Sequence, residues 1–395
     1  MQQPTPLSSE SLQASAAERS DRYIYIACPW APLGGGMFRV ADYLIQSQAA
    51  HTPADAARLR PLDTRGGGSA LLSLWVLLTA LVRILRGRLD GRLAGVHVNM
   101  AEKLSLFRKS MVVIVSNALG VPVVLHLHAQ MQRFYRRLPS PLRGAVRWVF
   151  SLAATVVVIG PAARRFVTEE LQVPADRVET IINGVPERML PRRARPAAGL
   201  KRILFLGNLS DLKGVSNLLH ALARPGLRDA GLEVAIAGGG DVEGYRAKAQ
   251  SLGIDGFVRF EGWCEQAKTA QLLAQADVLV LPSYDEVLPL VILEALANGV
   301  AVVCCPVGEI PSLLSDGVNV RFVAPGDIDG LAAALQQLRQ RPELLEQLGR
   351  NGRALYEQQF SLSRFFASVA RIHRRHFGVA GHARDAVAPS QEHAP

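Results

Sequence analysis

The sequence has few cysteines, and none of them stands in a metal-binding arrangement. Its four cysteines, at positions 28, 264, 304 and 305, form no C-x-x-C pair, and no histidine cluster has zinc-ligand spacing. Cys304 and Cys305 lie in the apolar run AVVCCP and are predicted to be small core residues. This usage excludes a disulfide scaffold and is typical of a reducing compartment, so we expect a cytoplasmic protein.

Long apolar runs are also scarce. The N-terminus shows no basic region followed by an apolar stretch, so we predict no signal peptide. The longest strongly apolar run, Ala70 to Val82, has thirteen residues, whereas a membrane-spanning helix needs about 20. Arginines follow this run at once, so it fits either a core helix or a helix that lies in a membrane interface.

Acidic residues are in the minority, since the net charge is +10. Residues 1–200 contain 25 Lys/Arg against 13 Asp/Glu, a balance of +12, and residues 201–395 contain 19 against 21, a balance of −2. The basic half indicates either an anionic partner or simply an arginine-rich surface. We expect no nucleic-acid partner, because the basic residues are not interleaved with aromatic ones on a strand or on one recognisable helix.

Strand and helix patterns alternate along two successive parts of the chain. The predicted strands lie near residues 23–29, 95–100, 121–129 and 154–160, and then near 202–206, 232–237, 257–262, 277–283, 300–306 and 319–325. A helical stretch from 328 to about 377 follows. This alternation predicts an α/β protein with two doubly wound, mostly parallel sheets. Ligands of such sheets gather at the carboxyl ends of the strands, here in a cleft between the two domains.

Composition sets the predicted domain boundaries. The segment LPRRARPAAGL, residues 190–200, combines two prolines with several arginines and predicts an interdomain linker. We therefore predict an N-terminal domain at 21–195 and a C-terminal domain at 196–378, with the last helix packing back on the N-terminal domain. The segments 1–20 and 379–395 are predicted to be disordered tails.

Two segments have a composition that can bind a ligand. Three glycines, Gly34 to Gly36, lead from the first strand into a helix, where the backbone can approach a phosphate closely or simply form a tight turn. The sharper segment is YDEVLPLVILEALANG, residues 284–299, in which seven residues separate Glu286 from Glu294. Glu286 is expected in a loop, Pro289 in the first turn of a helix, and Glu294 inside that helix. The N–H groups of this helix can receive a diphosphate, although two acids at this spacing also fit an ordinary surface.

The E-x7-E pattern, with PL-x-x-LEA-x-A-x-G after the first Glu, resembles the donor-binding motif of glycosyltransferase family 4. The segments PVVLHLHAQ, TIINGVP, FLGNLSDLKG, IAGGGD, VRFEGW and VAPGD resemble family segments in the same order, over roughly residues 23–375. The resemblance implies a retaining enzyme of the GT-B fold, in which two Rossmann-like domains face each other across a cleft. It further implies a hexosyltransferase that uses a GDP- or UDP-sugar and a lipid-linked or glycan acceptor, in exopolysaccharide, capsule or lipopolysaccharide synthesis.

The resemblance also implies roles for individual residues. His128, rather than His126, would contact the donor at the reacting centre, and Lys213 would neutralise charge on the leaving diphosphate. Glu286 would contact hydroxyls of the sugar, and Glu294 those of the ribose. The expected donor site comprises Gly35, Gly36, Asn208, Lys213, Glu286, Val287, Leu288, Pro289, Leu290 and Glu294. The family usually has an arginine where this chain has Asn208, so one cation is missing.

No metal or other cofactor is expected, because GT-B enzymes generally need none and the nucleotide sugar is a co-substrate. The only D-x-D, Asp327 to Asp329, opens a late helix, where an aspartate is expected as a cap. The expected partners are the nucleotide sugar, a polyprenyl-diphosphate-linked or glycan acceptor, and an anionic membrane surface reached through the basic N-terminal domain. Each basic residue near such a surface would contribute roughly 1 kcal/mol.

Two other functions stay open at this point. Asn208 favours a degenerate protein that binds a nucleotide sugar without turning it over, whereas Glu286, Glu294, Lys213 and His128 together favour an enzyme. A glycosidase or sugar phosphatase would need an acid pair of different organisation or a set of metal ligands, and the sequence shows neither clearly.

Overall fold

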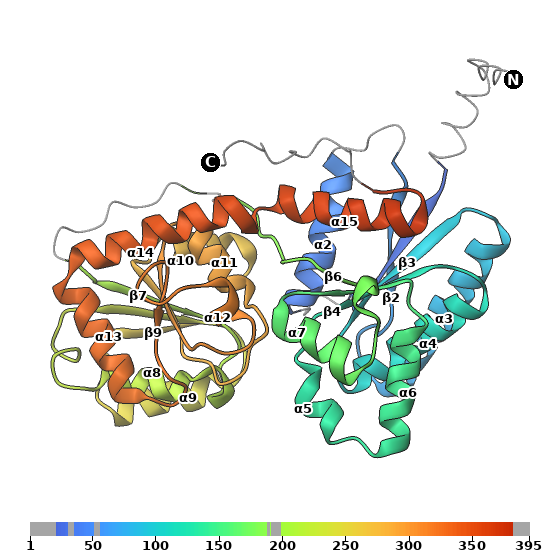
Figure 1. The fold of residues 1–395 in the computed structure, drawn as a ribbon. Coiled ribbons are helices and arrows are strands. Elements are labelled where there is room, and N and C mark those ends of the chain that lie inside the picture. The colour runs from blue at the N-terminus through green and yellow to red at the C-terminus, as the bar shows by residue number, and fades with distance from the viewer. Residues whose placement is uncertain (1–20, 31–34, 51–55, 188–189, 191–198, 382–395) are drawn as a thin grey trace, which may run out of the picture. The chain divides into compact units, whose positions relative to one another are not determined.

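The computed structural model describes residues 21–30, 35–50, 56–187, 190 and 199–381. The chain divides into two compact units: unit 1 is Met1–Ile182 with Ser363–Pro395, and unit 2 is Asn183–Leu362. Each unit contains one six-stranded parallel sheet with helices packed on it (Figure 1). The predicted α/β class with two successive doubly wound sheets is therefore confirmed.

The sheet of unit 1 has the strand order β2-β1-β3-β4-β5-β6. Its strands are β1 (Tyr23–Cys28), β2 (Arg58–Asp63), β3 (Leu93–Met100), β4 (Val123–Leu127), β5 (Thr155–Val158) and β6 (Val178–Thr180). Every residue of β1, β3, β4 and β5 is buried. Continuous burial is expected of parallel strands that have helices on both faces.

The sequence patterns miss two strands of unit 1. Strand β2 has the sequence RLRPLD, and Pro61 argues against a strand because proline cannot donate a ladder hydrogen bond. The structure places β2 at the edge of the sheet, paired only with β1, where proline is tolerated. Strand β6 has three residues and is too short to show a pattern.

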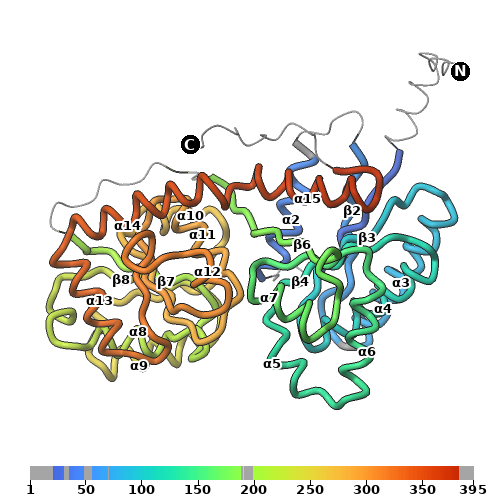
Figure 2. Tube along the Cα trace, viewed as in Figure 1, coloured from blue at the N-terminus to red at the C-terminus, as the bar shows by residue number. Residues whose placement is uncertain are grey.

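The helices of unit 1 are α2 (Gly36–Ala50), α3 (Ala70–Leu89), α4 (Leu104–Ala118), α5 (Met131–Arg136), α6 (Ser140–Ser151), α7 (Pro161–Arg165) and α15 (Leu362–Phe377), with the short π-helix η1 (Phe166–Glu170) and the 3₁₀ helix η2 (Ala175–Arg177). Helices α3, α4 and α6 lie side by side on the sheet (Figures 1 and 2). Right-handed crossovers explain this arrangement, because the connections that contain these helices all advance in one direction across the sheet. The connection from β1 to β2 runs the other way, so α2 covers the opposite face.

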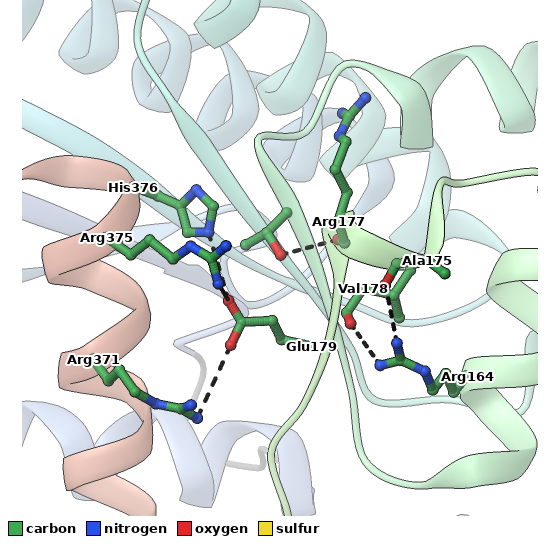
Figure 3. Close-up of polar contacts among 9 residues, drawn as sticks. Arg164, Ala175, Arg177, Val178, Glu179, Arg371, Arg375 and His376 are labelled. Atoms are coloured by element: carbon green, nitrogen blue, oxygen red, sulfur yellow. Dashed lines mark hydrogen bonds and ion pairs between the residues drawn. The ribbon is translucent and has the colours of Figure 1, made fainter.

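The C-terminal helix α15 is tied to the edge strand β6 of unit 1. Glu179 of β6 lies 4.0 Å from Arg371, 3.3 Å from Arg375 and 3.7 Å from His376, as Figure 3 shows. One carboxylate thus contacts three basic side chains on successive turns of α15. The same figure shows Arg164, which donates to the backbone oxygens of Ala175 and Val178 and so fixes the approach to β6.

The first residues after α15 are packed against unit 1. Val379 and Ala380 are buried, Ala57 N donates to Ala380 O at 2.9 Å, and Gln48 Nε2 donates to Gly381 O at 2.9 Å. The predicted disordered tail 379–395 is therefore wrong for residues 379–381, because two small apolar side chains there complete the packing. Residues 382–395 and the predicted tail 1–20 lie outside the described residues.

The sheet of unit 2 has the strand order β12-β11-β10-β7-β8-β9. Its strands are β7 (Arg202–Leu206), β8 (Glu233–Ala237), β9 (Val258–Gly262), β10 (Val278–Leu281), β11 (Ala301–Cys304) and β12 (Arg321–Phe322). Its helices are α8 (Val215–Leu222), α9 (Val242–Ser251), α10 (Gln266–Gln275), α11 (Leu290–Ala297), α12 (Ile310–Leu313), α13 (Ile328–Gln340) and α14 (Pro342–Leu355), with the 3₁₀ turn η3 (Asp211–Lys213) and the short π-helix η4 (Tyr356–Phe360). Cys304 and Cys305 are buried, as predicted.

The strand order of unit 2 creates a reversal point between two neighbouring strands. The chain runs from β7 outward to β8 and β9, then returns to the other side of β7 as β10 and continues outward to β11 and β12. The loops after β7 and β10 therefore diverge to opposite faces of the sheet. In doubly wound folds, ligands bind in the crevice that this divergence leaves at the carboxyl ends of the strands.

The boundary between the units lies at residues 182/183, not at the 195/196 position suggested by composition. Val185 forms a bridge with Ser361, and Tyr356 Oη donates to Val185 O at 3.1 Å, so this segment is already part of unit 2. Of the predicted linker 190–200, residues 191–198 lie outside the described residues.

Candidate functional site

An ion pair occupies the reversal point of unit 2. Lys213 ends the short turn η3 after β7, and Glu286 lies in the loop after the neighbouring strand β10. Lys213 Nζ lies 2.5 Å from Glu286 Oε1, and the two side chains are 27% and 10% exposed. The residues are 73 positions apart in the sequence. The fold therefore brings together two of the residues predicted to act in catalysis.

Close backbone contacts hold the loops that carry this pair. Gly214 has a φ of 74°, and a Cβ atom added there would lie 2.1 Å from Pro282 O. Only glycine adopts this conformation and allows this approach without strain. Tyr284 N donates to Leu212 O at 2.9 Å, which adds a direct bond between the two loops. The position of the Lys213 ammonium is thus set by the backbone of the DLKG turn.

Helix α11 begins beside the ion pair. Pro289 precedes the helix as its N-cap residue and Leu290 is the first helical residue, one position later than predicted, which is within the usual uncertainty of helix ends. The side chains of Leu288 and Leu290 are buried, so any ligand contact of these two residues runs through their main chains. Val287 O accepts from Glu309 N at 2.8 Å. This bond fixes the loop between the ion pair and the helix.

Glu294 lies in the second turn of α11 and is only 9% exposed. Glutamate is seldom buried to this extent, because a carboxylate loses much hydration free energy when it leaves water. The burial of Glu294 in the helix that follows the β10 loop is typical of an acid that makes specific hydrogen bonds.

Asn208 is exposed in the loop after β7 and lies beside the glycines that follow β8. Its Oδ1 would lie 3.2 Å from a Cβ atom added to Gly240. Gly238 has a φ of 150°, and an added Cβ there would lie 1.7 Å from Gly207 O, so this glycine is required for close packing of the two loops. These glycines therefore have a structural role in the packing of the two loops.

His128, the third predicted catalytic residue, lies in unit 1 directly after β4. Its Nε2 lies 2.8 Å from Asn99 Oδ1, and its backbone N–H donates to Met100 O at 2.9 Å. Asn99 Nδ2 donates to Ala27 O, so Asn99 Oδ1 is the acceptor of the first contact and His128 carries its proton on Nε2. Burial, with smaller effects of His97 and Lys109, lowers the pKa of His128 to about 3. The imidazole is therefore neutral, and its Nδ1 is a hydrogen-bond acceptor.

A row of histidines that sequence reasoning missed adjoins His128. His97 Nδ1 lies 2.8 Å from His373 Nε2 of α15, and His97 Nε2 lies 3.2 Å from His126 Nδ1. The rings of His126 and His128 have centroids 4.0 Å apart. Burial lowers the pKa of His97 to about 4 and that of His126 well below its ordinary value. His97 and His126 are therefore neutral, and the row joins α15 to strand β4, which His128 follows.

The remaining predicted site residues of unit 1 are the glycines before α2. Gly35 and Gly36 are exposed, and a Cβ atom added to Gly35 would meet nothing within 4 Å. Gly34 lies outside the described residues. The main chain at the start of α2 is therefore open to a ligand.

Metal ligands do not gather in the described part of the chain, where no three His, Cys, Asp or Glu side chains lie close enough to hold an ion. Asp327 accepts from Gly330 N at 2.8 Å and caps α13, as predicted.

Both halves of the chain match family models of glycosyltransferases. A model described as Glycosyltransferase Family 4 matches residues 35–188, and a model described as Glycosyl transferases group 1 matches residues 190–355. The chain is 30% identical over 226 residues to the MMP alpha-(1->4)-mannosyltransferase of Mycolicibacterium hassiacum, covering 56% of this chain and 54% of that protein. It is 28% identical over 285 residues to the alpha-D-kanosaminyltransferase of Streptomyces kanamyceticus, covering 66% of this chain and 72% of that protein. The chain thus spans about half the length of the first relative.

Solved structures share the fold at lower identity. Sucrose-phosphate synthase from Thermosynechococcus elongatus has a TM-score of 0.72 at 18% identity, covering 90% of this chain and 98% of that one. Anabaena HepE in complex with UDP has a TM-score of 0.69 at 17% identity, covering 90% of this chain and 100% of that one. At these identities the likeness concerns the fold alone.

Proposed function

The chain belongs to glycosyltransferase family 4, with the two α/β units of a GT-B protein, and we propose that it transfers a hexose from a nucleotide sugar with retention at the anomeric carbon. The observation that carries the proposal is the Lys213–Glu286 pair at the reversal point of unit 2, next to the start of α11. The donor is a GDP- or UDP-sugar. The acceptor is a lipid-linked or glycan molecule of exopolysaccharide, capsule or lipopolysaccharide synthesis.

The chemistry of the pair fits a leaving diphosphate. As the bond between the sugar and the diphosphate breaks, negative charge grows on the phosphate oxygens, and a positioned ammonium stabilises it. Lys213 supplies that ammonium, and the free N–H groups at the start of α11 add a positive partial charge. Glu286 orients Lys213 and accepts a hydrogen bond from a sugar hydroxyl. No metal is required by this scheme.

The relatives support the reaction class and leave the sugar open. The two relatives given above are a mannosyltransferase and a kanosaminyltransferase, and the HepE structure contains UDP. A donor panel therefore needs both GDP- and UDP-sugars.

A donor screen tests the proposal. The purified protein is incubated with a panel of nucleotide sugars, and release of GDP or UDP is followed beside thermal shifts. We expect one donor to stabilise the protein and to be turned over, with turnover lost in Glu286→Gln. Glu243→Gln, which changes an exposed glutamate paired with Arg246, is the matched control and retains turnover. Stabilisation without turnover, even with lipid acceptors present, would identify a binding protein instead.

We also propose that the protein is peripheral at the cytoplasmic face of a membrane, and helix α3 supports this. Its large apolar side chains at intervals of three and four residues are exposed: Leu71 81%, Trp75 64%, Leu78 51%, Val82 45%, Leu85 41% and Leu89 77%. A buried face with Leu77, Ala80 and Ile84 packs on the unit. The buried face agrees with the core-helix prediction for this segment, and the exposed apolar face supports the interfacial proposal.

The charge around this face favours an anionic surface. Residues 64–168, which include α3 to α6, contain 15 Lys/Arg and only two acidic residues, Asp90 and Glu102. On the neighbouring α4, Leu104 and Phe107 are 72% and 64% exposed. Apolar and aromatic side chains beside arginines are typical of interfacial helices. Among the described residues, no helix is both long and apolar enough to cross a bilayer.

Vesicle binding tests this part. We expect the protein to sediment with vesicles that contain anionic phospholipid and to bind neutral vesicles weakly. The triple variant Leu71→Ser, Trp75→Ser, Leu78→Ser should lose binding, whereas Trp263→Ser, which changes a tryptophan of unit 2 that is 60% exposed, should retain it. Equal binding of the wild type to both vesicles would refute the electrostatic contribution.

A further inference from the structure

A lysine with no exposed surface lies in helix α4 of unit 1. Lys109 is 0% exposed, and among the described residues the polar atom within hydrogen-bond distance of its Nζ is the thioether of Met37, at 3.5 Å. A thioether is a weak acceptor and carries no charge. Lysine is almost never fully buried without an anionic partner, because the ammonium loses its hydration. Among the described residues, Lys109 therefore has no anionic hydrogen-bond partner.

The residue next to Lys109 adds a second positive charge to this site. Arg108 has a buried Nε with no hydrogen-bond partner among the described residues. The pKa of Lys109 is lowered to about 8, mainly by burial and to a smaller extent by Arg108, while the nearby Cys28 opposes the shift. The carboxylate of Asp63 acts electrostatically on Arg108. Its Oδ1 already accepts from the backbone N–H groups of Trp30, Arg65 and Gly66 at 3.3, 2.9 and 3.1 Å.

These cations lie where the main chain offers further hydrogen-bond donors. Cys28 and Asp63 end strands β1 and β2, so the group stands at the carboxyl edge of the unit 1 sheet. Met37 is the second residue of α2, a helix of 15 residues, and Lys109 Nζ is thus directed at the first turn of that helix. The first turn of a helix carries a positive partial charge and unpaired N–H groups. Open space adjoins Gly35 immediately before it.

We propose that Lys109 and Arg108, together with the first turn of α2, form a binding site for a phosphoryl group of a substrate. The anion supplies the charge that the ligand-free site lacks. The flexible Met37 side chain gives way, and the phosphoryl oxygens take the place of its sulfur beside Lys109. The inference rests on the proposed function only for the identity of the ligand, which is either the donor diphosphate or a phosphate of a lipid-linked acceptor.

The proposal predicts opposite effects of one substitution on stability and on binding. In Lys109→Met, the ligand-free protein loses an uncompensated buried cation and gains an apolar side chain of similar length, so its unfolding temperature should rise. Its affinity for inorganic diphosphate should fall at least tenfold. Lys201→Met, which changes a half-exposed lysine of unit 2 paired with Glu233, is the control and should change neither. A lysine with a purely structural role would instead lower the unfolding temperature on removal.

Calorimetry with inorganic diphosphate at pH 8 supplies a second readout. Because the anion raises the pKa of the Lys109 ammonium, binding should take up protons, and the apparent enthalpy should vary with the ionisation enthalpy of the buffer. Arg108→Gln, at a partly exposed position, should also weaken diphosphate binding. This variant tests the proposed site if Lys109→Met does not fold. Unchanged diphosphate affinity in Arg108→Gln and in any folded Lys109→Met would overturn the proposal.

Two further probes distinguish the sources of the phosphoryl group. If the site holds the donor, Lys109→Met weakens UDP or GDP binding; if it holds the acceptor, the variant weakens farnesyl phosphate binding and leaves the nucleotide affinity unchanged. If diphosphate binding depends on Lys109 but no donor is turned over, the proposed function is refuted and the phosphoryl site is supported. Conversely, turnover with diphosphate affinity independent of both cations would refute this site alone.

Discussion

Two ion pairs connect strands β7 and β10 at opposite ends, and they should respond differently to substitution. Lys213–Glu286 lies at the carboxyl ends, at 2.5 Å, with side chains 27% and 10% exposed. Arg202–Asp277 lies at the amino ends, at 3.0 Å, with side chains 11% and 1% exposed. Asp277 also accepts from the backbone N–H groups of Lys201 and Arg202. The first pair is accessible to a ligand, whereas the second is enclosed in the fold.

Removal of one cation from each pair separates catalysis from stability. Arg202→Met leaves Asp277 buried without its cation, which should cost about 3–5 kcal/mol of unfolding free energy. Lys213→Met breaks a more accessible pair and should cost less, about 1–2 kcal/mol. Its kcat/KM should fall about 10²–10³-fold, or roughly 3–4 kcal/mol, because the leaving group loses its stabilising charge. Arg202→Met should retain kcat/KM within about threefold while it is folded.

Urea unfolding and nucleotide release, measured on the same preparations, test this contrast. The reasoning is refuted if Lys213→Met loses more unfolding free energy than Arg202→Met and retains near wild-type kcat/KM. A large loss of kcat/KM in folded Arg202→Met would also contradict the reasoning, because that pair lies at the amino ends of the strands, remote from the proposed donor site.

Two further predictions concern the backbone and the histidine row. Gly214→Ala should lower the free energy of unfolding by more than about 2 kcal/mol and lower kcat/KM, because the position combines a φ of 74° with a close approach to Pro282 O. Gly231→Ala is the control, since its φ is 64° and an added Cβ would meet nothing within 4 Å. In urea unfolding it should show only the conformational cost of about 1–2 kcal/mol. Burial lowers the pKa values of His97 and His128 to about 4 and 3 in the folded state, so the unfolded chain binds more protons below pH 6.5. The free energy of unfolding should therefore have its full value above pH 6.5 and decrease as the pH falls toward 4. Urea midpoints between pH 7 and 5 should show this slope, His97→Gln should flatten it and His220→Gln should not; a slope independent of His97 would contradict the account.

The parts of the site that could be predicted from the sequence are those encoded locally. The DLKG turn and the segment 284–299 each follow a strand within a few residues, so strand, loop and helix patterns place Lys213, Glu286 and Pro289 correctly. Their meeting depends on the return of β10 to the side of β7, which no local pattern specifies. The resemblance to a family predicts that Lys213 and Glu286 act in one site, whereas the spacing of the residues alone does not.

Other features depend on contacts between distant residues. His97 and His373 are 276 positions apart, and no periodicity connects them. The bridge from Val185 to Ser361 moves the unit boundary before the proline-rich segment that composition favoured. The apolar residues of α3 have helical spacing on two faces, and only the packing of the unit shows which face is covered.

Hydrogen–deuterium exchange with and without the donor identified in the screen tests the central claim most directly. If the nucleotide sugar binds at the reversal point of unit 2, backbone amides in residues 211–216 and 284–294 should be protected at saturating donor, and Lys213→Met should reduce this protection at the same concentration. Protection confined to other segments, with these two unchanged at saturation, would contradict the account.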